Sequence, residues 1–370
     1  MRKALVNCTI YSDKTDKGNA VIVVENGVIS EVTDRPPGDA QLIDVGGNHI
    51  APGMIDIQIN GGENCYFSDM PDEASLQDVY ESSLKYGATH ILPCLISSPK
   101  EKILQAIETV GSFKEKNAAV IGMHLEGPFI NPDKRGAHNE AIIRKPTDAE
   151  LEEIIRYGKD IIKMITIAPE MFTDEQLDML LESGIVVSAG HSNMNYKQAQ
   201  YYFNKGIKLV THLYNAMTQM GHREPGIVGA VFNNDSVYAP VILDGAHCDY
   251  AAAQVAYKIK KDKLILLSDA AFLGRKKQQF DSPLLNAKLV DGGDRNNYGN
   301  LAGAAISMIY AVQNAVKHVH IPLHEAVQMA TLHVAKAIGL QDKLGKIETG
   351  YPASFISFND DFSSCKTMVF

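Results

Sequence analysis

Apolar, β-branched runs recur along the chain, and amphipathic stretches separate most of them. Eight such runs cover Met54–Asn60, Ala88–Leu95, Ala119–Glu126, Ile161–Ala168, Ile185–Gly190, Ile207–His212, Val237–Leu243 and Leu264–Ser268. Near-continuous apolar strands that alternate with helices are typical of a parallel sheet covered on both faces. Eight successive units favour a closed (β/α)8 barrel of the TIM type, in which chemistry lies at the carboxyl ends of the strands.

The amphipathic stretches between these runs predict the helices of the barrel. They cover Glu73–Tyr86, Pro99–Lys116, Thr147–Tyr157, Thr173–Ser183, Asn195–Asn204 and Tyr250–Lys261. An amphipathic stretch favours a helix that buries one face against the sheet. Two further helices, over about Gly303–Val319 and Leu323–Ile338, are predicted after the last apolar run.

The two ends of the chain have a different pattern. Residues 1–50 carry short alternating strands with turn signals, and residues 341–370 include the strand-like run Leu344–Phe358. Neither piece is long enough for a stable sheet alone. We therefore predict an α/β protein with a small β-sandwich-like domain built from both termini, residues 1–50 plus 341–370, beside a barrel at 51–340.

Composition narrows the class of partner and the compartment. The chain has 370 residues, 44 acidic and 35 basic, and a net charge of −9, which argues against a nucleic-acid or anionic-membrane surface. Five scattered cysteines form no C-x-x-C pair, so neither a disulfide frame nor a zinc ribbon is indicated. The first apolar stretch is too short for a signal peptide, and no run approaches a membrane span. A cytoplasmic location is the expectation.

Four of the apolar runs end in, or next to, a residue that can bind a metal or move a proton. These residues are Glu126, His191, His212 and Asp269. Metal-assisted hydrolysis needs three protein ligands, an open position for water and a separate acid or base. The pattern favours that chemistry. Six of the chain's twelve histidines receive a structural interpretation instead: His49, His90, His318, His320, His324 and His333.

Several motifs resemble known proteins. The segment Pro52–Gly62, with Gly345–Gly350 and Ala353–Phe355, resembles the amidohydrolase superfamily. Within that superfamily, the following segments look like the N-acetylglucosamine-6-phosphate deacetylase family: His124–Asn131, Ala189–Ser192, Thr211–Met217, Arg223–Gly226 and Asp244–His247. The match runs through nearly the whole chain. It implies a metal-dependent deacetylase of amino-sugar catabolism that yields glucosamine 6-phosphate and acetate.

The resemblance also implies roles for the strand-end residues. Glu126, His191 and His212 become the ligands of one divalent cation per subunit, and a carboxylate with two imidazoles suits Zn²⁺ or Fe²⁺. Asp269 accepts the proton of the attacking water and delivers it to the departing amine. His138 matches the family's second donor to the amide oxygen, where negative charge develops.

Candidate substrate contacts follow from strand order, from side-chain chemistry and from the same resemblance. Asn215 and Ala216 are expected to open a short helix whose backbone amides hold the phosphate. Arg223 carries a planar cation suited to phosphate, and in the family this residue reaches the neighbouring subunit's site, which implies a homodimer. His247 matches a contact to a sugar hydroxyl. The small-molecule partner is thus a phosphorylated amino sugar.

The first strand departs from the wider superfamily, in which many members carry His-x-His to hold a second metal. Here Gln58 and Asn60 supply neutral amides, which are weak ligands for a first-row cation. We interpret them as a vestigial second-metal position. The departure points to one catalytic metal.

Three alternatives stay open or are weighed against this interpretation. The stretches Ala270–Arg275 and Leu301–Ala304 depart from the family pattern beside the expected sugar pocket, so the 4-epimer, N-acetylgalactosamine 6-phosphate, remains a candidate substrate. A catalytically inactive barrel scaffold is a different class, and the presence of Asp269 with all three ligands argues against it. A cyclic-amide hydrolase would typically use a metal-bridging lysine, and no lysine ends a candidate strand near the ligands.

Overall fold

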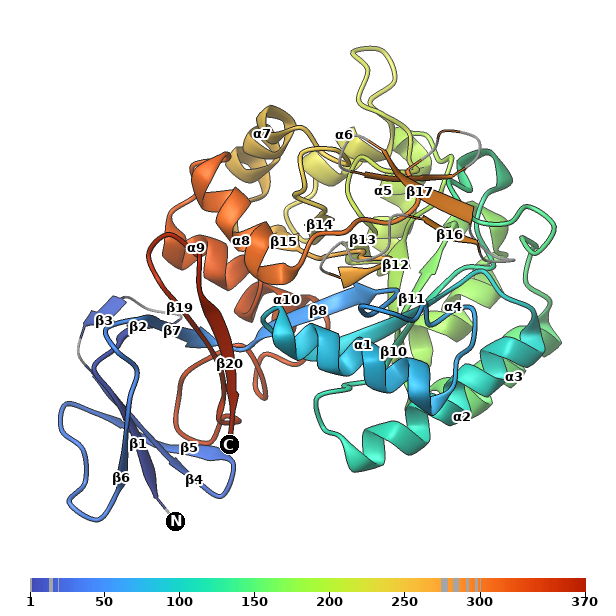
Figure 1. Ribbon diagram of the computed structural model, residues 1–370. Coiled ribbons are helices and arrows are strands. Elements are labelled where there is room, and N and C mark those ends of the chain that lie inside the picture. Colours follow the sequence, from blue (N-terminus) through green and yellow to red (C-terminus); the bar gives the residue numbers. More distant parts are fainter. Residues whose placement is uncertain are drawn as a thin grey trace.

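A computed structural model describes residues 2–12, 16–18, 20–273, 279–281, 286–290, 293–296, 299 and 301–370. Figure 1 shows a barrel of strands surrounded by helices, with a smaller pair of sheets at lower left that contains both termini. The barrel strands are β8 (Met54–Ile59), β9 (Ala88–Ile96), β10 (Met123–Glu126), β11 (Ile162–Ile167), β12 (Val186–Ala189), β13 (Leu209–Val210), β14 (Ala239–Val241) and β15 (Leu264–Leu266). Each of the eight strands overlaps one of the eight predicted runs.

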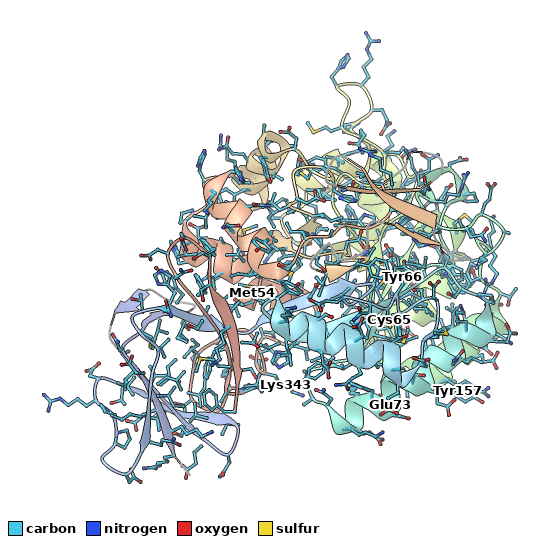
Figure 2. The ribbon with its side chains drawn as sticks, in the orientation of Figure 1. Met54, Cys65, Tyr66, Glu73, Tyr157 and Lys343 are labelled. Carbon is cyan, nitrogen blue, oxygen red and sulfur yellow. The ribbon has the colours of Figure 1, made fainter. Side chains whose placement is uncertain are left out.

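The eight strands follow one another in chain order around the barrel. Strands β8 to β13 form one parallel sheet, and β14 pairs with β15 in parallel. Isolated bridges complete the ring, because Leu209 pairs with Tyr238 before β14, and Ile59 at the end of β8 pairs with Ala270. The predicted TIM-type barrel is confirmed. Figure 2 labels Met54, the first residue of β8, and Tyr66, which lies in the segment after this strand.

Helices cover the outside of the barrel. They are α1 (Glu73–Lys85), α2 (Lys100–Lys116), α3 (Asp148–Gly158), α4 (Asp174–Glu182), α5 (Tyr196–Lys205), α6 (Gly226–Phe232), α7 (Tyr250–Lys260), α8 (Met308–Lys317), α9 (Leu323–Met329) and α10 (Leu332–Ala337). Short 3-10 turns are η1 (Pro132–Lys134), η2 (Pro169–Met171) and η3 (Lys261–Lys263). Side-chain caps fix several starts, as at α4, where Thr173 accepts from the Gln176 N–H and the Gln176 side chain accepts from the Thr173 N–H.

Two predicted helices were wrong in their extent. The single helix expected over Leu323–Ile338 is broken between α9 and α10, where the Thr331 hydroxyl donates to the Val327 carbonyl at 2.8 Å. The backbone of Gly345 packs so closely there that a Cβ would lie 2.7 Å from the Leu332 Cα. The helix expected from Gly303 begins only at Met308, because Gly303 has φ +76° and Ala304 pairs with Ala270 at the barrel rim.

One helix and one three-stranded sheet were not predicted. Helix α6 is buried along most of its length and consists of glycine, alanine and β-branched or aromatic residues, so its sequence carries no amphipathic pattern. Three antiparallel strands, β16 (Gln279–Asp281), β17 (Asn286–Val290) and β18 (Gly293–Asn296), follow the last barrel strand. A bridge between Arg295 and Leu301 connects them to the segment at the barrel rim.

The terminal domain consists of two sheets. One has the order β5-β4-β1-β6 and comprises β1 (Lys3–Val6), β4 (Val21–Glu25), β5 (Val28–Thr33) and β6 (Gln41–Asp44). The other has the order β20-β19-β7-β2-β3 and comprises β2 (Thr9–Tyr11), β3 (Asp16–Gly18), β7 (His49–Pro52), β19 (Ser354–Phe358) and β20 (Cys365–Val369). Because β19 pairs with β7, the two chain ends share a sheet, and the small domain built from both termini is confirmed. Its boundaries at residues 50 and 341 stay a prediction.

Two chain-wide expectations concern membranes and disulfides. Within the described ranges, no helix has both the length and the apolar character that crossing a bilayer requires. The five cysteines are all free, and Cys8, Cys94 and Cys248 are buried.

Candidate active site

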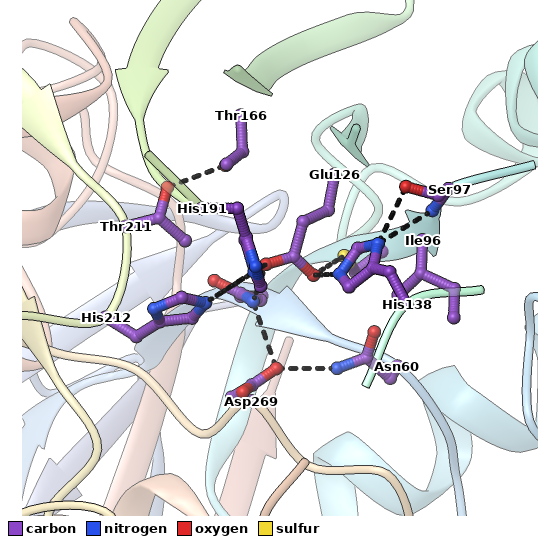
Figure 3. A network of polar contacts seen from close by, with 12 residues as sticks. Asn60, Ile96, Ser97, Glu126, His138, Thr166, His191, Thr211, His212 and Asp269 are labelled. Atoms are coloured by element: carbon purple, nitrogen blue, oxygen red, sulfur yellow. Dashed lines mark hydrogen bonds and ion pairs between the residues drawn. The ribbon is translucent and has the colours of Figure 1, made fainter. Parts of the chain in front are cut away.

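The four strand-end residues lie together at the carboxyl end of the barrel. Glu126 is the last residue of β10, whereas His191, His212 and Asp269 follow β12, β13 and β15. The three that follow a strand have positive φ angles of 47°, 29° and 48°, a conformation that residues other than glycine rarely adopt. Such backbone strain concentrates at functional sites. Here it accompanies side chains that converge on one point of the barrel mouth (Figure 3).

Glu126, His191 and His212 form a compact cluster of potential metal ligands. The Oε1 atom of Glu126 lies 3.1 Å from His191 Nε2 and 3.2 Å from His212 Nε2. The two Nε2 atoms are 3.2 Å apart, and all three side chains are buried. Two imidazole nitrogens that face the same carboxylate oxygen can bind one cation together with it, because each nitrogen can offer the cation a lone pair. The donor set fits a divalent metal that prefers nitrogen and oxygen ligands.

A backbone contact sets the tautomer of His191. Its Nδ1 lies 2.9 Å from the carbonyl oxygen of Lys134, which can only accept, so Nδ1 carries the proton. The lone pair of Nε2 then faces Glu126 and His212. An arrangement of this kind around a ligand histidine fixes the ring orientation and raises its basicity as a ligand.

The two amides of the first strand face carboxylates. Gln58 Nε2 donates to Glu126 Oε1 and to Asp269 Oδ1, each at 3.0 Å, and Asn60 Nδ2 donates to Asp269 Oδ1 at 2.8 Å. The amide oxygens of Gln58 and Asn60 are buried without a partner among the described residues. The NH₂ group of Gln58 thus donates to both carboxylates and partly offsets their negative charge.

The electrostatics of the two carboxylates differ. Burial raises the pKa of Asp269 to about 6, and the charge of Glu126 adds to the effect, while the hydrogen bond from Asn60 opposes it. Burial also disfavours the charged form of Glu126, but the contacts of its carboxylate with the imidazoles of His191 and His212 outweigh burial and hold its pKa well below the usual range. One carboxylate is therefore permanently charged, and the other titrates near neutrality, as a general base requires.

His138 lies on the loop after β10 and presents an N–H group to the cluster. Its Nδ1 lies 3.4 Å from the Ser97 backbone N–H, which donates to it, and 2.7 Å from Ser97 Oγ. The proton of the neutral ring is then on Nε2, which lies 3.9 Å from Glu126 Oε2. Burial lowers the pKa of His138 to about 3, so the ring stays neutral and can donate a hydrogen bond without carrying charge.

A pocket of about 420 Å³ opens above the cluster, a size typical of small-molecule sites. It contains most of the residues predicted from sequence: Asn60, Glu126, His138, His191, His212, Asn215, Ala216, His247 and Asp269. The residues 213–216 form turns, and the short helix expected at Asn215 is wrong, because the next helix, α6, begins at Gly226. Ala216 instead has a left-handed backbone with φ +50°.

Arg223 does not line this pocket. It is exposed on the loop between β13 and α6, which rises above the barrel in Figure 1. Within one chain, the structure therefore does not bring Arg223 to the cluster.

Several lining residues were missed from sequence. Tyr66, Ile96 and Ala302 belong to a small apolar cluster on one side of the pocket, and Lys134 and Arg135 lie on another part of its wall. Lys134 and Arg135 lie within four residues of His138, and this proximity in sequence could have identified them. Of the two atypical stretches, Leu301, Ala302 and Gly303 line the pocket, whereas residues 274 and 275 lie outside the described residues.

His247 is oriented by a nearby carboxylate. Its Nδ1 lies 2.7 Å from Asp244 Oδ2, and Asp244 Oδ1 accepts from the backbone N–H groups of Ala246 and His247. This leaves Nε2 of His247 available to a ligand in the pocket. Asp244 was not predicted as a site residue, although it opens the motif that contains His247.

The barrel, the buried ligand cluster and the adjacent titrating carboxylate define a metal-dependent hydrolase. Residues 49–369 match the Amidohydrolase family, and the chain belongs to that family.

Individual relatives narrow the comparison. An N-acetylglucosamine-6-phosphate deacetylase of Haemophilus influenzae is 34% identical, and the alignment covers 100% of this chain and 98% of the relative. An N-acetylgalactosamine-6-phosphate deacetylase of Shewanella is also 34% identical, with coverage of 84% and 79%. The crystal structure of N-acetylglucosamine-6-phosphate deacetylase from Pasteurella multocida superposes with a TM-score of 0.95 at 35% identity and covers 100% of this chain and 98% of that one.

Proposed function

We propose that this protein hydrolyses N-acetyl-D-glucosamine 6-phosphate to D-glucosamine 6-phosphate and acetate. The observation that carries the proposal is the convergence of Glu126, His191 and His212 on one point, with Asp269 linked to the same cluster through Gln58. Full-length similarity to deacetylases of this substrate supports the choice of reaction.

Each catalytic residue has a defined task in this reaction. A divalent cation held by Glu126, His191 and His212 supplies Lewis acidity, which lowers the pKa of water and polarises the amide carbonyl. Asp269 accepts a proton from the water whose oxygen forms the new bond to the acetyl carbon. The same carboxyl group then gives that proton to the amide nitrogen as the C–N bond breaks, so that acetate and the amine leave.

His138 acts on the other side of the reacting amide. Its neutral ring presents the Nε2–H towards the cluster, so it can donate to the carbonyl oxygen as negative charge develops there. A charged imidazolium is not required, because burial disfavours it.

The sugar phosphate is expected to lie across the pocket from His138. Asn215, Ala216 and His247 line the side that follows β13 and β14. Arg223 is exposed and does not line the pocket of its own chain, and we infer that it serves the site of a neighbouring subunit in a homodimer. An exposed loop with a permanent cation at its tip is suited to a phosphate on another chain.

The proposal includes one metal per subunit, Zn²⁺ or Fe²⁺, and a cytoplasmic location. The single-metal assignment is supported by the Gln58 and Asn60 N–H groups, which face Asp269 and Glu126. If the side-chain amides of Gln58 and Asn60 were flipped, their oxygens would face the site instead, and a neutral carboxamide oxygen is a poor ligand for Zn²⁺ or Fe²⁺.

The second candidate substrate is N-acetylgalactosamine 6-phosphate. The observation that favours it is the position of Leu301 and Gly303 in the pocket wall, because this stretch departs from the deacetylase pattern. The inactive scaffold has no comparable support, since it would not require three buried ligands and a titrating carboxylate.

The test is acetate release from each pure epimer by the metal-loaded protein. We expect a higher kcat/KM for the gluco epimer than for the galacto epimer. The reverse order would transfer the assignment to the 4-epimer, and no acetate from either substrate would contradict deacetylation altogether.

A further inference from the structure

Glu170 joins loops that follow three different barrel strands. It lies in η2, after β11, and its Oε1 accepts from the Asn131 Nδ2 at 3.0 Å and from the Asn193 backbone N–H at 2.7 Å. Its Oε2 accepts from the Ser192 hydroxyl at 2.7 Å. Asn131 lies on the loop after β10, whereas Ser192 and Asn193 follow His191 on the loop after β12. Hydrogen bonds to a charged carboxylate are stronger than neutral ones, so these three bonds fix the positions of the donors relative to Glu170.

The first connection to His191 runs through Asn131. The backbone N–H of Asn131 donates to the His191 carbonyl at 2.9 Å, and its carbonyl accepts from the Lys134 N–H at 2.9 Å. Lys134 in turn accepts the Nδ1–H of His191 on its own carbonyl. Gly136 on the same loop packs against the His191 ring, where a Cβ would lie 3.4 Å from Cε1. The position of this loop therefore sets both the tautomer and the direction of the imidazole.

The second connection runs along the chain itself. Ser192 and Asn193 follow His191 directly, and both donate to Glu170. They hold the turn in which His191 has its left-handed φ of 47°. The Ser192 N–H also donates to the Ala216 carbonyl at 3.1 Å, which connects the turn to the pocket segment after β13.

We propose that Glu170 is a positioning residue for the metal ligand His191. Its hydrogen bonds hold the loops after β10 and β12 together, and this keeps the Nε2 lone pair of His191 directed at Glu126 and His212. This inference rests on the proposed role of His191 as a ligand, and it extends the site to a carboxylate that does not line the pocket.

The substitution Glu170→Gln tests the carboxylate with little change in size. A glutamine has one acceptor oxygen and an NH₂ group, which would face either the donors Asn131 and Asn193 or the Ser192 hydroxyl. The matched control is Glu175→Gln on α4, which removes the same charge five residues away on an exposed surface.

The readouts are the rate at which a chelator removes Co²⁺ from the loaded protein, the visible ligand-field spectrum of that Co²⁺, and the melting temperature of the metal-free protein. We expect Glu170→Gln to release Co²⁺ about 10–100-fold faster and to change the spectrum, since losses of this size follow removal of a ligand's hydrogen-bonded support. Glu175→Gln should leave the release rate and the spectrum at the native values.

A purely structural role would lower the melting temperature and leave Co²⁺ release and spectrum unchanged, and that result would overturn the proposal. If Glu170→Gln does not fold, Ser192→Ala removes one of the three donors and should accelerate release in the same direction by a smaller factor. Unchanged release in Ser192→Ala would then contradict the positioning role. None of the three readouts uses sugar phosphate, so failure of the deacetylase assignment would appear separately, as absent acetate release by the native protein.

Discussion

The terminal domain and the barrel mouth bury side chains of opposite character. Between the two terminal sheets lies a cluster of fully apolar contacts, among them Leu5, Ile22 and Ile29, each 0% exposed. The mouth buries Gln58, Glu126 and Asp269, which are 0%, 3% and 9% exposed, and leaves amide oxygens without a partner among the described residues. The first arrangement is favourable by itself, whereas the second costs free energy unless something neutralises it.

This contrast in buried side chains indicates that the barrel mouth is the functional region. Apolar burial needs no ligand to be stable, so the core of the terminal domain contributes stability by itself. Buried carboxylates and imidazoles on a strained backbone are unfavourable for folding, and such features are found mainly at sites that bind a ligand or catalyse a reaction. Substitutions in the two regions should consequently change different quantities.

The largest expected effect is on kcat, from Asp269→Asn. The amide keeps the size of the side chain but cannot accept the proton, and loss of a general acid or base typically costs about 10²–10⁴ in rate. We expect a loss at least that large with metal content largely retained. Steady-state kinetics of the metal-loaded variant check this, and a near-normal kcat would remove Asp269 from the mechanism.

The matched substitution in the terminal domain is Leu5→Ala. Truncation of a fully buried leucine costs about 2–5 kcal/mol of unfolding free energy. Urea denaturation should show that loss, while kcat of the folded protein stays within about twofold of native, a difference worth less than 1 kcal/mol. A rate loss comparable to that of Asp269→Asn would break the contrast between the regions.

The next effect concerns KM and the exposed loop. If Arg223 contacts the phosphate of a neighbouring subunit, Arg223→Ala should raise KM for the phosphorylated sugar far more than for N-acetylglucosamine. A hydrogen bond to a charged group is worth about 1.5–3 kcal/mol, or roughly 10–150-fold. Mixed dimers of Arg223→Ala and Asp269→Asn subunits should regain activity, because one hybrid site carries both native residues. No recovery after proven subunit exchange would assign Arg223 to its own chain or to no site.

A further effect, on stability at acid pH, concerns buried histidines of the barrel. Burial lowers the pKa of His90, His124 and His333 to about 4, so these barrel histidines stay neutral in the folded state while the unfolded chain protonates below its ordinary value of 6.5. Stability is therefore lost as pH falls from about 6.5 to about 4, by roughly 1.4 kcal/mol per pH unit for each histidine.

Two aspartates act in the opposite direction. Burial raises the pKa of Asp56 and Asp269 to about 6, so protonation below that pH favours the folded state. The histidines outnumber them, because His138 is also held neutral by burial, and the net effect is acid destabilisation of the metal-free barrel. Urea midpoints between pH 7 and 4.5 should fall, and His90→Gln should make the decline shallower. An equal slope in native protein and His90→Gln would contradict this assignment.

Sequence periodicity was sufficient for the eight barrel strands but not for elements whose form depends on distant contacts. The break at Thr331 follows from a side-chain bond to Val327 and from the close approach of Gly345, and neither contact is visible in local pattern. Helix α6 is buried too completely to show amphipathic periodicity.

The candidate site shows the same limit. Strand-end positions and motifs identified Glu126, His191, His212 and Asp269 because each ends an apolar run or follows one directly. Tyr66 reaches the pocket from a loop and carried no such signal, whereas Ile96 ends β9 but has an apolar side chain that suggests no chemistry. Glu170 also had none, since its connection to His191 exists only where three loops meet.

The most direct test of the account is an anomalous difference map from crystals of the metal-loaded protein, without excess metal in the buffer. We predict one strong peak per chain within bonding distance of Glu126, His191 and His212, with the amides of Gln58 and Asn60 still turned towards the carboxylates. A second peak of full occupancy that touches Gln58 or Asn60, or a single peak away from the three ligands, would contradict the mononuclear site on which the proposed function depends.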